Sequence, residues 1–167
     1  MMDLRIRTAT QNEAELLGGI IRRAFQDVAQ RFGLTPENCP THPSHHTMEK
    51  VQAELRKGVV YYLAEVEGKA IGCGALEKTD QGIFYLERLA VLPDARKQGI
   101  GEALVRHMFQ LAADEQAKAI SIAIVAQHTE LQSWYEALGF VLVEKKRFAH
   151  LPFDVAFMTY EIGQCQQ

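Results

Sequence analysis

Hydrophobic positions recur along the first third of this chain with the period of an α-helix. From Leu16 to Val28 the apolar residues repeat every three to four positions and form one broad face. The segment Thr10-x-x-Glu13 precedes this face with the pattern of a capping box, and Gly33 follows it at a place suited to a left-handed helix end. The pattern therefore predicts a long amphipathic helix that ends near Gly33.

Elsewhere the hydrophobic pattern changes to short apolar or alternating runs separated by turn residues, which is typical of strands. Helices recur between the later runs. The predicted strands are Leu4–Thr8, Val59–Val66, Ala70–Glu77, Ile83–Leu92, Ile120–Val125, Val141–Lys146 and Ala156–Ile162, and the further helices are Met48–Arg56, Gly99 to about Gln116 and His128–Leu138. An antiparallel meander followed by a β-α-β-α-β run predicts an α+β fold, a mixed α/β sandwich.

Length and composition favour one globular domain over residues 1–167. Hydrophobic residues make up 47% and charged residues 23%, as in an ordinary soluble domain. With 18 basic and 21 acidic side chains there is no basic stripe, so we expect no nucleic-acid partner.

The cysteines and the apolar runs bear on the compartment. Cys39, Cys73 and Cys165 are an odd, widely spaced set that does not suggest a disulfide framework. The N-terminus has no signal-peptide pattern, and the longest uncharged run is too short to cross a bilayer. We expect a cytoplasmic protein with no membrane partner.

The most informative segment runs from the strand Ile83–Leu92 through Pro93 to two glycines at the start of a helix. Glycines at such a turn let the backbone approach a ligand closely, and the free N–H groups of the first helical turn bind anions. Arg96 and Lys97 add positive charge. The Lys-Ser/Thr pair of a nucleotide P-loop is missing, and Leu104 stands where a dinucleotide fingerprint needs its third glycine. The segment therefore predicts a phosphate cradle of another kind.

The spacing Arg96-x-x-Gly99-x-Gly101 resembles the acyl-coenzyme A motif of the GNAT superfamily of N-acetyltransferases. In that family, backbone amides of this turn hold the coenzyme A pyrophosphate, and the preceding strand binds the pantetheine and acetyl carbonyl. The resemblance implies a GNAT-like fold, with a central, mostly antiparallel, twisted sheet of about seven strands and helices on both faces. It also implies acetyl-coenzyme A as the acyl donor, held by Leu89, Ala90, Val91, Arg96, Lys97, Gln98, Gly99, Ile100, Gly101, Glu102 and His128.

A second segment, Tyr135-x-x-x-Gly139-Phe140, is similar to a motif that the same family carries where a helix runs into a strand. Two nearby positions depart from the family pattern. His128 stands where members often have Asn, and Leu131 stands where they often have Ala. These departures bear on the coenzyme contact of this helix's first turn and not on the fold.

Acyl transfer from a thioester to an amine needs a base, an oxyanion stabiliser and a proton for the leaving thiolate. Glu87 is the candidate base, and the alternative is an ion pair or a solvated strand end. Strand alternation predicts two faces. One carries Tyr85, Glu87, Leu89 and Val91, and the other carries Phe84, Leu86, Arg88, Ala90 and Leu92.

The family resemblance implies that Tyr135 is the general acid, whereas a purely structural reading packs it in the core with its hydroxyl satisfied. Cys73 raises the alternative of a covalent acyl-enzyme. No His or Asp pattern supports it, and a Cys beside Gly72 and Gly74 more often packs as a small hydrophobic residue. Direct transfer is the favoured reading.

The loop Asn38–Thr47 combines prolines with Cys39, His42, His45 and His46 at short spacings. Zinc was weighed against a proline-stiffened loop that caps the next helix, and no metal is expected. The family resemblance implies that this region lines the acceptor pocket, so His42, His45 and His46 are candidate substrate contacts. The later loop Arg147–Asp154 is the matching wall, with His150 and Asp154 as candidates.

These observations together predict an enzyme that acetylates a primary amine of a small molecule or peptide by direct attack in a ternary complex. Two other classes stay open. One is a catalytically silent acyl-coenzyme A sensor or interaction module, and the other is a nucleotide-binding regulatory domain, which the missing Lys-Ser/Thr pair disfavours. A net charge of −3 is too small to identify the acceptor, and the sequence neither supports nor excludes a homodimer.

Overall fold

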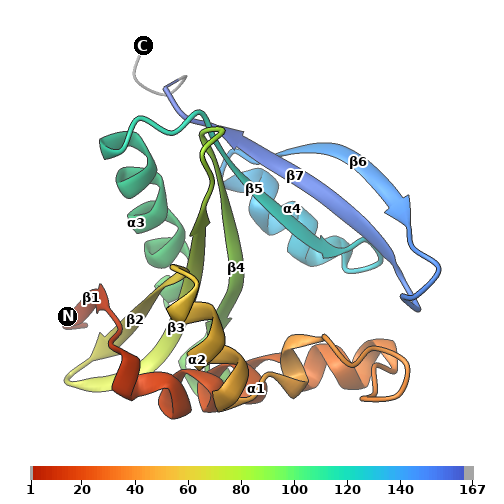
Figure 1. The fold of residues 1–167 in the computed structure, drawn as a ribbon, viewed down its shortest axis with the longest axis horizontal. Helices are drawn as coiled ribbons and strands as arrows, with labels where there is room; N and C mark the ends of the chain where they lie inside the picture. The colour runs from red at the N-terminus through yellow and green to blue at the C-terminus, as the bar shows by residue number, and fades with distance from the viewer. Residues whose placement is uncertain (1, 164–167) are drawn as a thin grey trace.

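A seven-stranded sheet in the order β1-β2-β3-β4-β5-β7-β6 organises the chain in the computed structural model, which describes residues 2–163 (Figure 1). The strands are β1 (Leu4–Thr8), β2 (Val60–Val66), β3 (Lys69–Lys78), β4 (Ile83–Val91), β5 (Ala119–Val125), β6 (Val141–Arg147) and β7 (Asp154–Glu161). The helices are α1 (Ala14–Phe32), α2 (Met48–Arg56), α3 (Ile100–Asp114) and α4 (Thr129–Ala137). Short 3-10 helices lie at Gln11–Glu13, Pro43–His45 and Pro93–Ala95.

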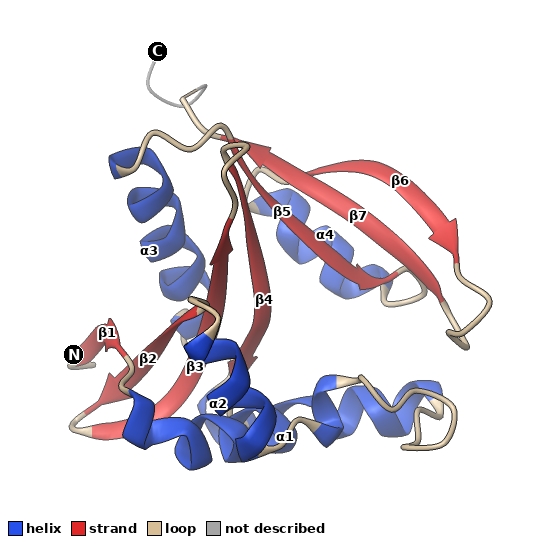
Figure 2. Ribbon diagram, viewed as in Figure 1, coloured by secondary structure: helices blue, strands red, loops and turns tan. Residues whose placement is uncertain are grey.

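The strand pairs are antiparallel except for β4 and β5, which run parallel. This parallel pairing is short and joins Ile83–Tyr85 to Ala119–Ser121. Beyond Tyr85 the two strands diverge, and Figure 2 shows them separating between the halves of the sheet. Side chains of α1 and α2 share one core with the sheet, and those of α3 and α4 share another. The predicted mostly antiparallel α+β fold with helices on both faces is confirmed.

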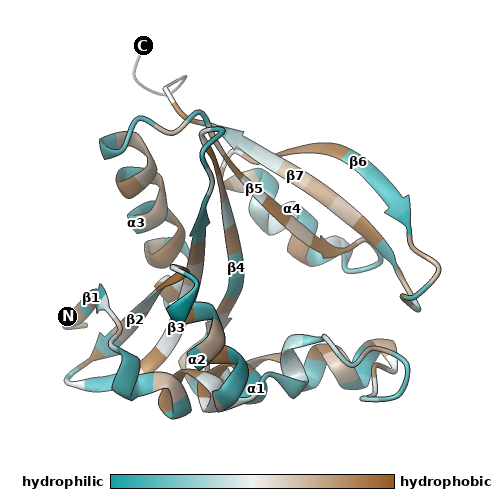
Figure 3. Ribbon diagram, in the orientation of Figure 1, coloured by the Kyte–Doolittle hydropathy of each residue, from teal (hydrophilic) through white to brown (hydrophobic). Residues whose placement is uncertain are grey.

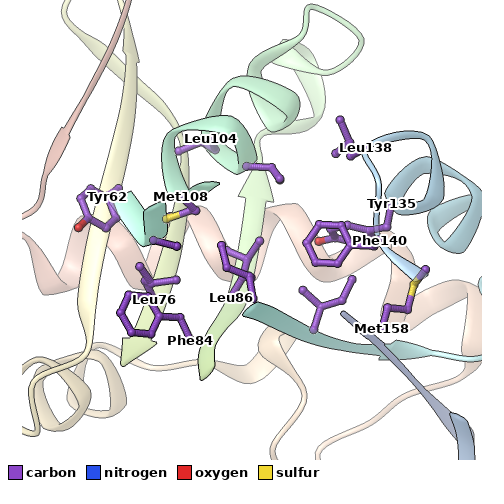
Figure 4. Close-up of a cluster of buried hydrophobic side chains, with 14 of the residues drawn as sticks. Tyr62, Leu76, Phe84, Leu86, Leu104, Met108, Tyr135, Leu138, Phe140 and Met158 are labelled. Carbon is purple, nitrogen blue, oxygen red and sulfur yellow. The ribbon is translucent and has the colours of Figure 1, made fainter. Parts of the chain in front are cut away.

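Alternation along β2 shows how the sheet supplies both cores. Tyr61 and Leu63 pack toward α1 and α2, whereas Tyr62 and Ala64 pack toward α3. The close-up of the second core shows Leu86 of β4 between Tyr62 on one side and Tyr135 on the other (Figure 4). In the hydropathy view, β6 changes from hydrophobic to hydrophilic along its length, as its sequence VLVEKKR requires (Figure 3). The core therefore runs continuously from β2 across β4 to α4.

Strand β4 does not keep the uniform alternation that the sequence predicts. A bulge places two residues of β4 opposite Gly74 of β3, where the register shifts, and Arg88 has a left-handed φ of 52°. Leu89 packs with Leu86 toward α3, and Ala90 packs toward α1. The predicted faces were therefore wrong beyond Glu87, because the extra residue reverses which side each later side chain faces.

Within residues 2–163, no helix combines the length and apolar character needed to cross a membrane. Of the three cysteines, Cys39 and Cys73 are buried free thiols, and Cys165 lies outside the described residues.

Candidate active site

A cavity of about 1130 Å³ opens where β4 and β5 diverge. Its walls come from β4, β5 and β7, from the turn between β4 and α3, and from parts of α1 and α4. Because the two strands no longer pair there, their backbone groups are available to a ligand. The site thus lies at the only interruption of strand pairing inside the described sheet order.

The predicted glycine turn forms one end of this cavity. Gly99 is the N-cap of α3, with a left-handed φ of 82°, and the exposed Lys97 also has a positive φ of 63°. At Gly101 an added Cβ would lie 3.3 Å from Cζ2 of Trp134, so a side chain would narrow the space between α3 and α4. The first-turn N–H groups of α3 have no partner within the helix and suit an anion.

Arg96 does not present a free charge to this turn. Its Nη1 lies 2.7 Å from Oδ2 of Asp27, and its Nη2 donates to the carbonyl of Ala24, 2.6 Å away. Its Nε donates to the carbonyl of Val91 at 3.3 Å. Arg96 therefore fastens the turn to α1, while Lys97 has no ion-pair partner among residues 2–163.

The backbone of β4 directs two amides into the divergence from β5. The N–H of Leu92 donates to the carbonyl of Ile71 on β3. Because successive backbone groups point to opposite edges of a strand, the N–H groups of Leu89 and Val91 point toward β5. Both residues line the cavity, so their amides can serve as hydrogen-bond donors to a ligand there.

Glu87 lies on the cavity wall in contact with Arg88, whose Nη2 is 2.8 Å from Glu87 Oε2. Burial raises the pKa of Glu87 above its usual range, although the Arg88 guanidinium opposes this shift. A carboxylate with a raised pKa is a better proton acceptor than an exposed one. Both sequence alternatives for Glu87 are thus present, because it forms an ion pair and also faces the cavity.

Arg88 is the centre of a buried polar network behind Glu87. Its Nε donates to the Tyr61 hydroxyl at 2.7 Å, and its Nη2 lies 3.2 Å from Oε2 of Glu54. The Tyr61 hydroxyl donates to Oε1 of Glu54 at 2.7 Å, and Nε2 of His46 lies 2.8 Å from the same oxygen. This network holds α2, β2 and β4 together and fixes the position of the Glu87 partner.

Tyr135 lines the cavity from the opposite side of the sheet. Its ring packs edge-on against Trp134 and Phe140, 5.0 Å and 5.2 Å away between centroids. The hydroxyl has no hydrogen-bond partner among the described residues, and burial raises the pKa of Tyr135 well above its usual value. The side chain therefore packs in the core, as the structural reading expected, and keeps a protonated hydroxyl to offer.

His128, at the N-cap of α4, carries a buried Nδ1 atom without a hydrogen-bond partner among the described residues. Burial, aided by the nearby Arg31 charge, lowers the pKa of His128, so its imidazole is neutral. Buried polar atoms are normally paired. The unpaired atom on the cavity wall fits a ligand that supplies the missing partner.

The proline-containing loop divides its three histidines between different surroundings. His42 is buried on the cavity wall, where its Nδ1 bonds to the Ser44 hydroxyl at 2.8 Å and burial lowers its pKa to about 4. His46 is committed to Glu54, and neither His45 nor His150 lines the cavity. Among the described residues, no group of three or more His, Cys, Asp or Glu side chains is arranged to hold a metal ion.

The remaining candidates are also placed by the structure. Those that line the cavity are Leu89, Ala90, Val91, Arg96, Lys97, Gly99, Ile100, Gly101 and Glu102, whereas Gln98 is exposed outside it. Burial raises the pKa of the Cys73 thiol to about 12, so it stays protonated and is a poor nucleophile. Sequence reasoning missed Arg88, Phe25 and Phe157. A bulge that redirects Arg88 and two rings that meet the cavity from distant elements leave no local pattern.

Comparison with known proteins gives concordant matches. A model of the acetyltransferase (GNAT) family matches residues 19–140. The chain is 27% identical to an uncharacterized N-acetyltransferase, YjgM, of Escherichia coli K12, over 72% of this chain and 74% of that protein. It is 29% identical to an amino-acid acetyltransferase of Mycobacterium tuberculosis, over 74% and 70% of the two chains.

Solved structures share the fold at low identity. A PaiA N-acetyltransferase from Thermoplasma acidophilum, in complex with coenzyme A, superposes with a TM-score of 0.79 at 17% identity, covering 96% of this chain and 99% of that one. The ribosomal-protein-S18-alanine N-acetyltransferase of Escherichia coli gives a TM-score of 0.77 at 17% identity, covering 95% and 94%. These likenesses support the architecture described above.

Proposed function

Because this chain belongs to the acetyltransferase (GNAT) family, we propose that it transfers an acetyl group from acetyl-coenzyme A to a primary amine of a small molecule or peptide. The resemblance drawn from the two sequence motifs is confirmed, and the chain is an N-acetyltransferase. One observation carries the proposed direct transfer. Glu87 and Tyr135 line the same cavity from opposite faces of the sheet, where β4 leaves β5.

The donor fits the glycine-turn end of the cavity. The first-turn N–H groups of α3 and the charge of Lys97 suit a pyrophosphate, and Gly101 leaves room for it beside Trp134. The pantetheine arm carries amides that can pair with the Leu89 and Val91 backbone and with Nδ1 of His128. These features use the backbone, so the site requires small residues at the turn more than particular side chains.

Glu87 prepares the acceptor. An amine is protonated near neutral pH and cannot attack a carbonyl until it loses one proton. The Glu87 carboxylate accepts that proton directly or through water, and the nitrogen lone pair forms a bond to the thioester carbon. The Leu89 and Val91 amides stabilise the charge that develops on the carbonyl oxygen.

Tyr135 completes the transfer. As the carbon–sulfur bond breaks, its hydroxyl donates a proton to the leaving sulfur, and the phenolate regains a proton from the newly bonded nitrogen through water. Glu87 returns its proton to solvent, so the balance is one amide, one thiol and one proton released. The raised pKa of Tyr135 keeps the hydroxyl protonated before transfer.

The test couples donor binding to product formation. Acetyl-coenzyme A affinity is measured by calorimetry, and thiol release is measured with polyamines, amino acids, aminoglycosides, aromatic amines and short peptides. Release with one amine class, strongly reduced in Glu87→Gln and with donor affinity retained, supports the proposal. Donor binding without release across the panel would favour the catalytically silent acyl-coenzyme A sensor, and no donor binding would contradict the donor site itself.

A further inference from the structure

The half of the sheet beyond β5 is covered by a helix on one face only. Met158 of β7 packs into the core shared by α3 and α4, so its neighbour Phe157 faces the other way. Phe157 pairs with Ala123 of β5, and Val155 pairs with Val125, and all four line the cavity. This surface is a continuous apolar wall on the side from which Glu87 faces the cavity.

A second apolar wall faces it from α1 and two loops. Phe25 and Val28 of α1 line the cavity, and the Phe25 ring meets the His42 ring edge-on at 5.9 Å between centroids. Leu151 and Phe153, from the loop between β6 and β7, contribute the remaining side chains. None of these residues binds a phosphate or a peptide backbone by its side chain, and all suit an apolar group.

The two walls meet at their outer edge. Leu151 and Phe153 pack against the small buried cluster of Ala29, Leu34 and Cys39. Arg31 of α1 also pairs with Glu130 of α4, through Nη2 and Oε1 at 3.1 Å. These contacts span the space between α1 and the second half of the sheet, so the volume beside Glu87 is bounded and suits a small molecule.

The charges at this end of the cavity disfavour a second anion on the acceptor. Arg88 is shared among Glu87, Glu54 and the Tyr61 hydroxyl, so it has no uncommitted positive charge. Glu87 and Glu144 also line the cavity, and the buried imidazole of His42 is neutral. A carboxylate next to the reacting amine would be desolvated near negative charges without a free cationic partner among the described residues.

We infer that the acceptor is a small primary amine attached to an aromatic or branched apolar body, with no carboxylate beside the amine. The body lies between the Phe157 wall and Phe25, and the amine reaches Glu87. This inference rests on the proposed acetyl transfer and narrows its acceptor class.

Four matched acceptors test the inference with the intact enzyme and saturating acetyl-coenzyme A. They are 2-phenylethylamine, L-phenylalaninamide, L-phenylalanine and ethylamine, and the rate of thiol release gives kcat/KM for each. We expect 2-phenylethylamine to exceed L-phenylalanine by about 100-fold, since an unpaired buried charge costs several kcal/mol. L-Phenylalaninamide, which has a similar size without the charge, should recover most of the activity, and ethylamine should lose about 10-fold or more for want of apolar contact.

Variants locate the effect. Phe153→Ala should raise KM for 2-phenylethylamine several-fold while leaving acetyl-coenzyme A affinity unchanged, and Phe153→Leu should restore part of the loss. Val141→Ala, at an exposed β6 position outside the cavity, is the matched control and should change neither constant.

The outcomes separate the inference from the proposed function. If L-phenylalanine is acetylated as well as its amide, or ethylamine as well as 2-phenylethylamine, the acceptor class is wrong while acetyl transfer stands. If the donor binds but neither this set nor the wider amine panel releases thiol, both proposals fail.

Discussion

The two halves of the sheet are covered differently. In the first half, β2 and β3 are packed on both faces, and Leu63, Cys73 and Leu76 are completely buried. In the second half, α4 covers one face of β5 and β7, and apolar side chains such as Phe157 line the cavity on the other. Stability is therefore concentrated in the first half, and ligand binding uses the uncovered face of the second. The boundary lies where β4 leaves β5, and the candidate base and acid lie on either side of it.

The largest expected effect comes from the boundary. Glu87→Gln should lower kcat about 1,000-fold, because a positioned general base contributes that order of rate. The carboxylate form is required, and burial raises its pKa, so wild-type kcat/KM should fall as pH drops through a value above the ordinary carboxyl range. Rate measurements across pH should show that acidic limb in the wild type and not in the variant. An unchanged profile in the variant would assign the limb to another group.

Removing a core side chain from the fully covered half should affect stability instead. Leu63→Ala is expected to lower the free energy of unfolding by about 3 kcal/mol, the usual cost of a buried cavity. Phe157→Ala removes a larger side chain from the half with one open face, and should cost less than half as much while reducing acceptor turnover. Urea unfolding of both variants makes the comparison. Equal losses would contradict the proposed division between the halves.

Tyr135→Phe separates the hydroxyl from the ring. The ring packs with Trp134 and Phe140, so the variant should unfold like the wild type. Because the hydroxyl has no partner among the described residues, its loss should act on chemistry, lowering kcat about 100-fold with little change in donor affinity. Single-turnover kinetics and calorimetry measure the two quantities. An unchanged kcat would mean that water supplies the proton.

The smallest effect is expected at the glycine turn. Gly101→Val places a branched side chain against Trp134 and over the first turn of α3, and should weaken acetyl-coenzyme A binding about 10-fold or more with the fold intact. Gly19→Ala is the control, since its added Cβ meets nothing within 4 Å. Affinity of the Gly101 variant equal to that of the control would contradict the assignment of the donor site to this turn.

Much of the fold was determined by local sequence. The capping box before α1, the glycine stop after it and the apolar periods of α3 and β2 act over a few residues, so their patterns predict the elements directly. The glycine turn and the Tyr135–Phe140 segment are also local, and both lie where the sequence placed them. The donor end of the cavity could therefore be predicted from the sequence.

The acceptor end depended on contacts between distant residues. The bulge at Arg88 arises from how β3 and β4 pair, and Arg96 is held by Asp27, 69 positions away. No local pattern distinguishes His42, on the cavity wall, from His46, bound to Glu54. Periodicity and capping are properties of neighbouring residues, whereas strand register, ion pairing and cavity walls follow from packing. The sequence alone thus determined the elements and the donor turn, and the tertiary structure decided the surroundings of Glu87 and the apolar walls beside it.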